Sequence, residues 1–297
     1  MGRQKENISK IRCAHHNLIP GCVLKEQISI LLIIGLLLLR FAAGWLPGLL
    51  NTDPSWLRVS DCVLSFLLIA SLIYLNKDRL GSFNFDKLAI IILLFFIPLQ
   101  TILLPLLVNS SSSILAFPHF LSWITILISV ILFLLVRKNI GTMPNITARN
   151  WKWALGGAVC GVTLSILMGI LIRLVAPMEI PLPKFDYTLF LAFPYQLGFA
   201  AAYEEPLYRG FLWGELKRTT KWKTAWIILF QAIIFMLAHG VVFLAPPQYP
   251  AFLVIFLAGI VFGLLVFYSR SITASMTAHA FYNSFGLFTA YIINWQF

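Results

Sequence analysis

Residues 28–50 read ISILLIIGLLLLRFAAGWLPGLL, an apolar run with one charge, Arg40. A helix needs about 20 apolar residues to cross a bilayer, and this run is long enough. It lacks the alternation of polar and apolar residues that a membrane β-strand requires. Backbone polar groups in hydrocarbon must be hydrogen-bonded within the chain, so the run predicts a transmembrane helix.

The rest of the chain has the same character, because 60% of its 297 residues are hydrophobic and only 11% are charged. This composition is far from that of a soluble domain. We predict an all-α, polytopic membrane helix bundle of about eight or nine transmembrane helices in the plasma membrane. The candidate runs are Ile28–Leu50, Cys62–Leu75, Leu88–Val108, Ile114–Val136, Trp153–Val175, Leu189–Trp213, Ala225–Phe243, Phe252–Tyr268 and Ile272–Ile293.

The net charge of +11 is spread unevenly over the connecting loops. Lysine and arginine collect in the leader before residue 28, in alternate loops at 77–87, 137–152 and 217–223, and at Arg270. Positive loops mark the cytoplasmic side of a membrane protein. We therefore expect a cytoplasmic N-terminus and an external C-terminus, and we do not expect nucleic-acid binding.

Three regions follow from the distribution of polar residues. Residues 1–27 form a polar cytoplasmic leader that does not resemble a signal peptide, and residues 28–187 form the N-terminal transmembrane helices. Residues 188–297 hold most of the polar groups within apolar runs and form the expected functional core. The leader contains possible zinc ligands in an irregular spacing that favours a chance cluster: Cys13, His15, His16 and Cys22.

Few ionisable residues interrupt the first half. We expect Arg40 and Asp61 to lie near the ends of their helices and to extend toward the membrane interface, as long or polar side chains near helix ends do. We interpret His119 in the same way.

The most unusual stretch is AAYEEPLYRG, residues 201–210, which places Glu204, Glu205 and Arg209 in a predicted span. Each central charge costs roughly 2.5 to 3.5 kcal/mol, so partners are required. Glu205 and Arg209 are four residues apart and predict a structural ion pair. Glu204 is turned about 100° away and has no cation at the third or fourth following position. Pro206 cannot hydrogen-bond to Ala202, which loosens the helix beside both carboxylates.

Other polar side chains lie at a similar depth in later spans. Counting about 1.5 Å per residue from the basic loops places Glu204, His239, His279 and Asn283 in one slab of the bilayer. His279 and Asn283 share a helix face. A carboxylate, two imidazoles and an amide at one depth favour a functional site, and a buried helix-packing network is the alternative. The small residues Gly259 and Gly263 predict close helix packing.

Three motifs together resemble those of a known family. EEPLYR (204–209) resembles EExxxR, FMLAH (235–239) resembles FxxxH, and HAFYN (279–283) resembles HxxxN. This order is that of the CPBP family, also called ABI, which comprises CAAX prenyl endopeptidases and bacteriocin-processing membrane proteins. The resemblance covers about residues 188–295.

The resemblance implies an intramembrane endopeptidase that acts on a peptide or membrane protein, with prenylated peptides among the candidate substrates. It implies that Glu204 activates water with help from His239, that Glu205 and Arg209 brace the helix, and that His279 and Asn283 stabilise the oxyanion. We favour catalysis without a metal, since the chain has no HExxH motif and Asn283 fits an oxyanion donor better than a zinc ligand. A zinc ion held by Glu204, His239 and His279 is the alternative.

Two other functions are compatible with the same residues. The first is a non-enzymatic member of the family, a bacteriocin immunity factor or membrane scaffold. The second is a proton-coupled transporter that uses Glu204 and the histidines as a relay. The chain lacks the paired broken helices of inverted repeats, which disfavours the transporter.

Overall fold

The computed structural model describes residues 20–49, 55–107, 119–142, 146–175, 188–240 and 250–295. These residues form helices joined by short turns, and they contain no strand. The elements are α2 (Pro20–Leu49), α3 (Ser55–Leu75), η2 (Leu80–Phe83), α4 (Lys87–Leu107), α5 (His119–Thr142), α6 (Ala148–Val175), α7 (Thr188–Gln196), η4 (Leu197–Ala201), α8 (Ala202–Glu205), η5 (Pro206–Leu212), α9 (Trp213–Thr219), α10 (Thr224–Leu237), α11 (Pro250–Ser269) and α12 (Ile272–Trp295).

The predicted all-α fold is confirmed, and a helix covers most of every apolar run predicted from the sequence. Within the described residues, four helical segments are long and apolar enough to cross a membrane: Leu24–Leu46, Trp123–Gly141, Ala148–Leu171 and Phe252–Ser269. The total of about eight or nine spans and the cytoplasmic N-terminus stay predictions.

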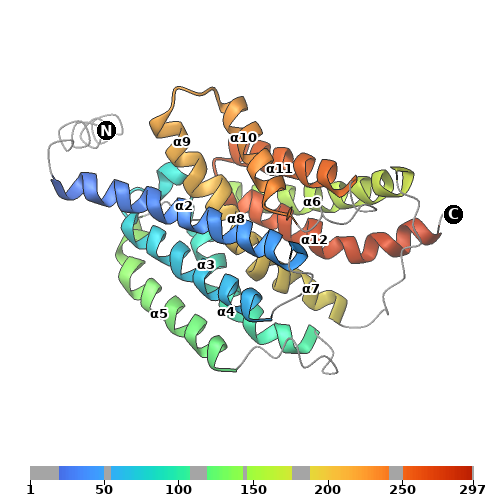
Figure 1. Cartoon of the computed structure of the whole chain (residues 1–297), viewed down its shortest axis with the longest axis horizontal. Helices are drawn as coiled ribbons and strands as arrows, with labels where there is room; N and C mark the ends of the chain where they lie inside the picture. The colour runs from blue at the N-terminus through green and yellow to red at the C-terminus, as the bar shows by residue number, and fades with distance from the viewer. Residues whose placement is uncertain are drawn as a thin grey trace.

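A continuous helical segment, residues 188–219, runs through the middle of the bundle (Figure 1). It comprises α7, η4, α8, η5 and α9, and we call it the central helix. Helices α2 to α5 lie mainly on one side of it, and α6, α10, α11 and α12 lie on the other (Figure 1). Because α4 and α12 both pack against α7 and η4, the central helix joins the two groups.

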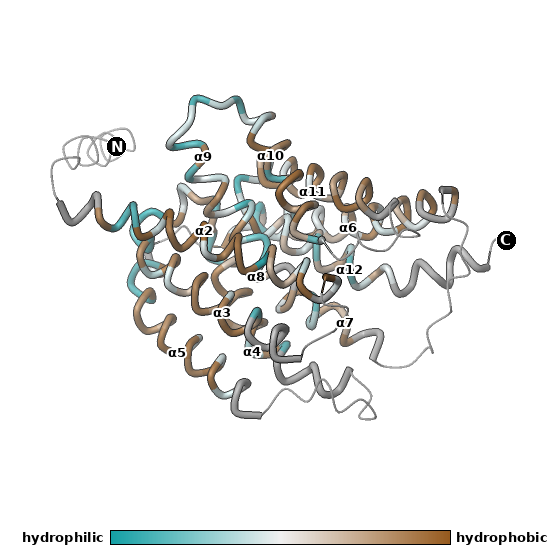
Figure 2. Tube along the Cα trace, viewed as in Figure 1, coloured by the Kyte–Doolittle hydropathy of each residue, from teal (hydrophilic) through white to brown (hydrophobic). Residues whose placement is uncertain are grey.

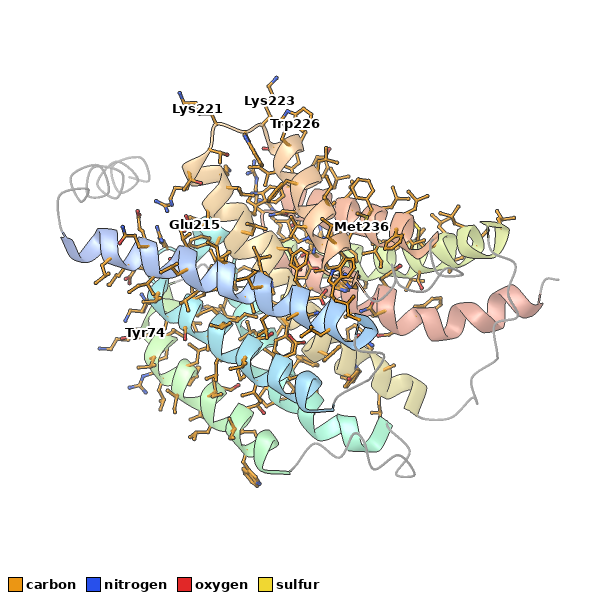
Figure 3. All side chains as sticks on the ribbon, viewed as in Figure 1. Tyr74, Glu215, Lys221, Lys223, Trp226 and Met236 are labelled. Atoms are coloured by element: carbon orange, nitrogen blue, oxygen red, sulfur yellow. The ribbon has the colours of Figure 1, made fainter. Side chains whose placement is uncertain are left out.

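The outer faces of the bundle are apolar, as the brown segments of Figure 2 show for α5, α6 and α11. Leu155 of α6 is 68% exposed and Leu31 of α2 is 66% exposed. Such a surface is unfavourable in water and is expected where helices contact lipid. Lys221 and Lys223 instead project from the hydrophilic connection between α9 and α10 (Figure 3). The protein is therefore an integral membrane protein.

Glycines allow several helices to approach closely. The predicted role of Gly259 and Gly263 is confirmed: an added Cβ would lie 3.0 Å from Ala232 Cα and 3.0 Å from Ile228 Cγ2, respectively, both on α10. A second pair was not anticipated from the sequence. Gly157 and Gly161 on α6 face α12, where an added Cβ would lie 2.2 Å from the carbonyl oxygen of Ala274 or of Ala278.

Asp86 fixes the start of α12. Its carboxylate accepts hydrogen bonds from the hydroxyls of Ser271 and Thr273, the latter at 2.6 Å, and from Asn150 Nδ2 at 3.0 Å. The side chain therefore joins the segment before α4 to α6 and α12. Because the first turn of α12 is held in place, the position of every later residue along that helix, relative to α4 and α6, is fixed.

An ion-pair ring near one end of the bundle links α2 to the central helix. Arg218 lies 2.9 Å from Glu26 and 2.6 Å from Glu215, while Arg79 lies 3.5 Å from Glu26 and 3.6 Å from Glu215. Glu26, Arg79 and Arg218 are each about one-third exposed or more, so each pair contributes little, typically about 0.2 to 1 kcal/mol.

The adjacent glycines of α6 provide a matched test of this packing. We expect Gly157→Ala to lower the melting temperature in detergent, because its Cβ would lie 2.2 Å from the Ala274 oxygen. Overpacking of this kind costs about 1 to 3 kcal/mol. Gly156→Ala has no atom within 4 Å of the new Cβ and should leave stability unchanged or slightly higher. Equal melting temperatures for the two variants would contradict the α6–α12 contact.

Candidate active site

The central helix changes its winding on both sides of the two glutamates. Glu204 and Glu205 belong to the short segment α8, and the flanking segments η4 and η5 are π-helical. The second π-helical segment begins at Pro206, where the missing N–H removes a normal α-helical bond. The predicted loosening at Pro206 is therefore confirmed. Such π turns are rare and occur frequently at functional sites.

Side chains from other elements bind the carbonyl groups of this segment. Gln231 of α10 donates its amide to the carbonyl of Tyr208, and Asn84 Nδ2 donates to the carbonyl of Arg209 at 3.2 Å. Asn84 adopts a left-handed conformation, with φ of 59°, directly after η2. These bonds satisfy backbone acceptors that would be costly to leave free in a dry interior.

Glu205 and Arg209 form the ion pair predicted from their spacing, with 3.1 Å between Oε1 and Nη1. Both side chains are fully buried. Arg209 also donates to the carbonyl of Gly259 at 3.0 Å, and its guanidinium lies 4.6 Å from the centre of the Phe235 ring. The pair thus braces the central helix against α10 and α11.

Glu204 finds its cation on a distant helix. Arg40 of α2 pairs through Nη2 with Glu204 Oε1 and through Nη1 with Asp61 Oδ2, the second at 2.5 Å. The Arg40 side chain is 17% exposed, and those of Asp61 and Glu204 less than 10%. The prediction that Arg40 and Asp61 extend to the membrane interface is therefore wrong.

The sequence contained one signal for this arrangement. Arg40 has about ten apolar residues on either side in its run, or about 15 Å of helix in each direction. A side chain at that depth cannot easily reach the interface, so a buried carboxylate is the expected partner. Local spacing could not identify which carboxylate, because Glu204 is 164 positions away.

His279 of α12 contacts both glutamates. Its Nδ1 lies 2.8 Å from Glu205 Oε1, and its Nε2 lies 3.8 Å from Glu204 Oε2. The ring stacks on Phe262, with 4.9 Å between centroids. Since a carboxylate oxygen accepts, Nδ1 donates to Glu205, and Nε2 faces Glu204.

His239 lies in the turn that ends α10. Its Nδ1 is 2.7 Å from the carbonyl oxygen of Phe235, to which it donates. The Phe235 ring contacts both His239, at 4.7 Å between centroids, and His279, at 5.7 Å. The two imidazoles are therefore neighbours across one aromatic ring.

Asn283 lies one turn beyond His279 on α12, and its Nδ2 donates to Gln196 Oε1 of α7 at 3.2 Å. The structure thus places Glu204 beside His279, with His239 adjacent through Phe235 and Asn283 at the edge. The predicted roles of these residues in chemistry stay predictions. Cys13, His15 and His16 of the leader lie outside the described residues, as do the side chains of Cys22 and His119.

The alternative zinc ligands are not grouped around one point. Among the described side chains, no group of three or more His, Cys, Asp or Glu residues is placed to hold a metal ion. Arg40 engages only Oε1 of Glu204, and Nδ1 of His239 and of His279 lies against an oxygen acceptor, a contact that zinc-binding histidines also make through the ring nitrogen that does not bind the metal. The choice between metal-free and zinc catalysis therefore stays a prediction.

Guanidinium groups and carboxylates differ in number at the site. The guanidinium groups of Arg40 and Arg209 face the carboxylates of Asp61, Glu204 and Glu205. A third positive charge is present only when an imidazole is protonated, such as that of His279, which lies between two of these carboxylates.

Comparison with protein families bears on this site directly. Residues 186–285 match the family model of type II CAAX prenyl endopeptidase, Rce1-like. This part of the chain is an Rce1-like domain. The match is consistent with the CPBP resemblance, and it includes Glu204, His239, His279 and Asn283 but neither Arg40 nor Asp61. Curated proteins and solved structures gave no match to the chain.

The ion pairs of Glu204 and Glu205 should differ in their contribution to stability. Glu205→Gln strands the fully buried guanidinium of Arg209, and Arg209→Ala removes the brace to Gly259. Breaking a buried pair costs about 3 to 5 kcal/mol. Glu204→Gln should lower the free energy of unfolding by less, because Arg40 would still be paired with Asp61, which lies 2.5 Å away. Thermal unfolding in detergent measures the stability of the three variants. Equal, small decreases in melting temperature for all three would contradict the expected difference.

Proposed function

We propose that the protein is an intramembrane endopeptidase of the CAAX protease type, which hydrolyses a peptide bond with water activated by Glu204. One observation carries this proposal. Glu204 Oε2 is buried in the Rce1-like domain, has no hydrogen-bond partner among the described residues, and lies 3.8 Å from His279 Nε2. A polar gap of that length suits a bridging water better than a direct bond.

Glu204 Oε2 defines how a water would be oriented. It accepts hydrogen bonds, so a water in the gap beside His279 can donate one O–H group to it. The oxygen lone pairs of this water then point away from Glu204 and toward a substrate carbonyl. Glu205 orients His279 through Nδ1, as a carboxylate orients the base in other hydrolases.

The reaction follows as general base catalysis. Glu204 takes a proton from water, and the water oxygen bonds to the carbonyl carbon of the peptide. When the C–N bond breaks, Glu204 returns the proton to the leaving amine. Asn283 stabilises the charge on the carbonyl oxygen, and His279 adds a second donor, Nε2–H, when its ring is protonated, while His239 supports the base from the turn after α10.

The substrate would be a peptide or a membrane protein segment within or beside the bilayer, since the site lies inside a helix bundle with an apolar exterior. The family description adds prenylated peptides as the first class to test. A soluble globular substrate would have to unfold to reach Glu204.

Loss of the base should abolish cleavage. We expect no products from Glu204→Gln, because the amide cannot accept the proton of water, and a rate about 10² to 10³ lower for Asn283→Ala, the effect of losing one oxyanion donor. Terminal-peptide mass spectrometry of membranes with wild-type or variant protein identifies the substrates. Folded Glu204→Gln protein that cleaves like wild type would exclude the protease and favour a non-enzymatic scaffold.

Catalysis should also survive removal of metal ions. Arg40 pairs with Glu204 Oε1, so the proposed base has a cationic partner without a metal ion. Purified protein treated with a chelator, and shown by elemental analysis to be metal-free, is expected to retain its activity on an identified substrate. Complete loss that zinc restores would show that the ligands rearrange to bind metal.

A further inference from the structure

We propose that Arg40, anchored by Asp61, is a positioning residue that holds Glu204 Oε1 and so directs Oε2 toward His279. Helix α2 would then be part of the active site, although it lies outside the Rce1-like domain. This inference rests on the proposed function of Glu204. It adds two residues from the N-terminal helices to the apparatus that the family motifs define.

The guanidinium of Arg40 joins two carboxylates with its two terminal nitrogens. Nη1 binds Asp61 Oδ2 at 2.5 Å, and Nη2 binds Glu204 Oε1. Ser65 Oγ donates to the other oxygen of Asp61 at 3.1 Å. A planar guanidinium held on one arm by a fixed carboxylate fixes the direction of the other arm. The chain Ser65–Asp61–Arg40 therefore orients Glu204 from one side.

The two oxygens of Glu204 are thereby given different tasks. Oε1 is occupied by Arg40, and Oε2 remains free of protein donors and faces His279 Nε2. Without Arg40 the carboxylate could rotate, and either oxygen could approach His279. Asp61 shares the positive charge of Arg40, so Arg40 orients Glu204 without devoting its whole charge to that carboxylate.

Close packing brings α2 to the second imidazole as well. Gly44 lies one turn after Arg40, and an added Cβ there would be 1.9 Å from the carbonyl oxygen of Ala238. The neighbouring Trp45 donates through Nε1 to the carbonyl of Leu237 at 2.8 Å. A Cβ on Gly240 would be 2.2 Å from the Trp45 ring. Helix α2 thus contacts the residues on both sides of His239.

A purely structural role for Arg40 is the competing explanation. The ion-pair ring of Glu26, Arg79, Glu215 and Arg218 already links α2 to the central helix, and three of its members, Glu26, Arg79 and Arg218, are partly exposed. A second connection through a buried guanidinium adds little stability, since the free-energy cost of its desolvation offsets most of its attraction to the carboxylates. Its direct contact with Glu204 therefore indicates a role in catalysis.

Arg79 supplies a matched control for the experiment. It is also an arginine that pairs with two carboxylates and joins α2 to the central helix, through Glu26 and Glu215. We would compare Arg40→Gln, Arg40→Lys, Arg79→Gln and Glu204→Gln in lipid nanodiscs. Each is assayed for kcat and KM on a peptide from the substrates that mass spectrometry identifies, with the melting temperature as a control for folding.

We expect Arg40→Gln to lower kcat by about 10- to 100-fold with KM nearly unchanged, because displacement of a reacting group by about 1 Å has effects of this size. Arg40→Lys should recover part of kcat, since it retains the charge but loses the planar fork. Arg79→Gln should keep the wild-type kcat. If Arg40→Gln does not fold, Asp61→Asn replaces it and should also lower kcat at constant KM.

Each contrary result has a distinct meaning. This inference would be overturned if folded Arg40→Gln kept the wild-type kcat while Glu204→Gln was inactive; the proposed function would still stand. Where Asp61→Asn replaces Arg40→Gln, the same result in folded Asp61→Asn has the same meaning. Equal decreases of kcat in Arg40→Gln and Arg79→Gln would also overturn the inference, because they would show that Arg40 only connects α2 to the central helix. Wild-type kcat in folded Glu204→Gln would remove the proposed function itself.

Discussion

Ionised side chains inside an apolar helix bundle must be paired, and this requirement organises the protein. Glu204, Glu205 and Arg209 stand on one short segment of the central helix, where each unpaired charge would cost roughly 2.5 to 3.5 kcal/mol. Their partners come from different directions. Arg209 pairs with Glu205 on the same helix, and Arg40 of α2 pairs with Glu204. His279 of α12 lies close to both glutamates.

The irregular winding of the central helix follows from the same arrangement. Pro206 breaks the regular bonding next to the glutamates, and the chain continues as a π-helical segment whose carbonyls are bound by Gln231 and Asn84. Glycines then let the surrounding helices approach. Gly259 exposes its carbonyl to Arg209, and Gly161 lets α12 approach α6 next to His279. Close packing and polar bonding therefore act together, as is typical where helices associate in lipid.

The buried carboxylates connect this architecture to chemistry. A site that only held helices together would be most stable with every buried polar atom paired, because an unpaired one is unfavourable in a medium of low dielectric constant. Here three carboxylates face two guanidinium groups, and Oε2 of Glu204 and Oε2 of Glu205 have no hydrogen-bond partner among the described residues. Such a site is suited to accept a proton, which is what activation of water requires.

The sequence alone determined the helical membrane fold, because apolar runs of bilayer length have only one way to satisfy their backbone. It also determined the Glu205–Arg209 pair and the close approach at Gly259, since helical periodicity and residue size fix such features locally. Three separate motifs indicated Arg209, His239 and His279, which meet around Phe235. The partner of Glu204 was decided by the tertiary structure only. Arg40 and Asp61 lie on helices with no motif, and an ion pair across 164 positions depends on how helices pack, which no local period encodes.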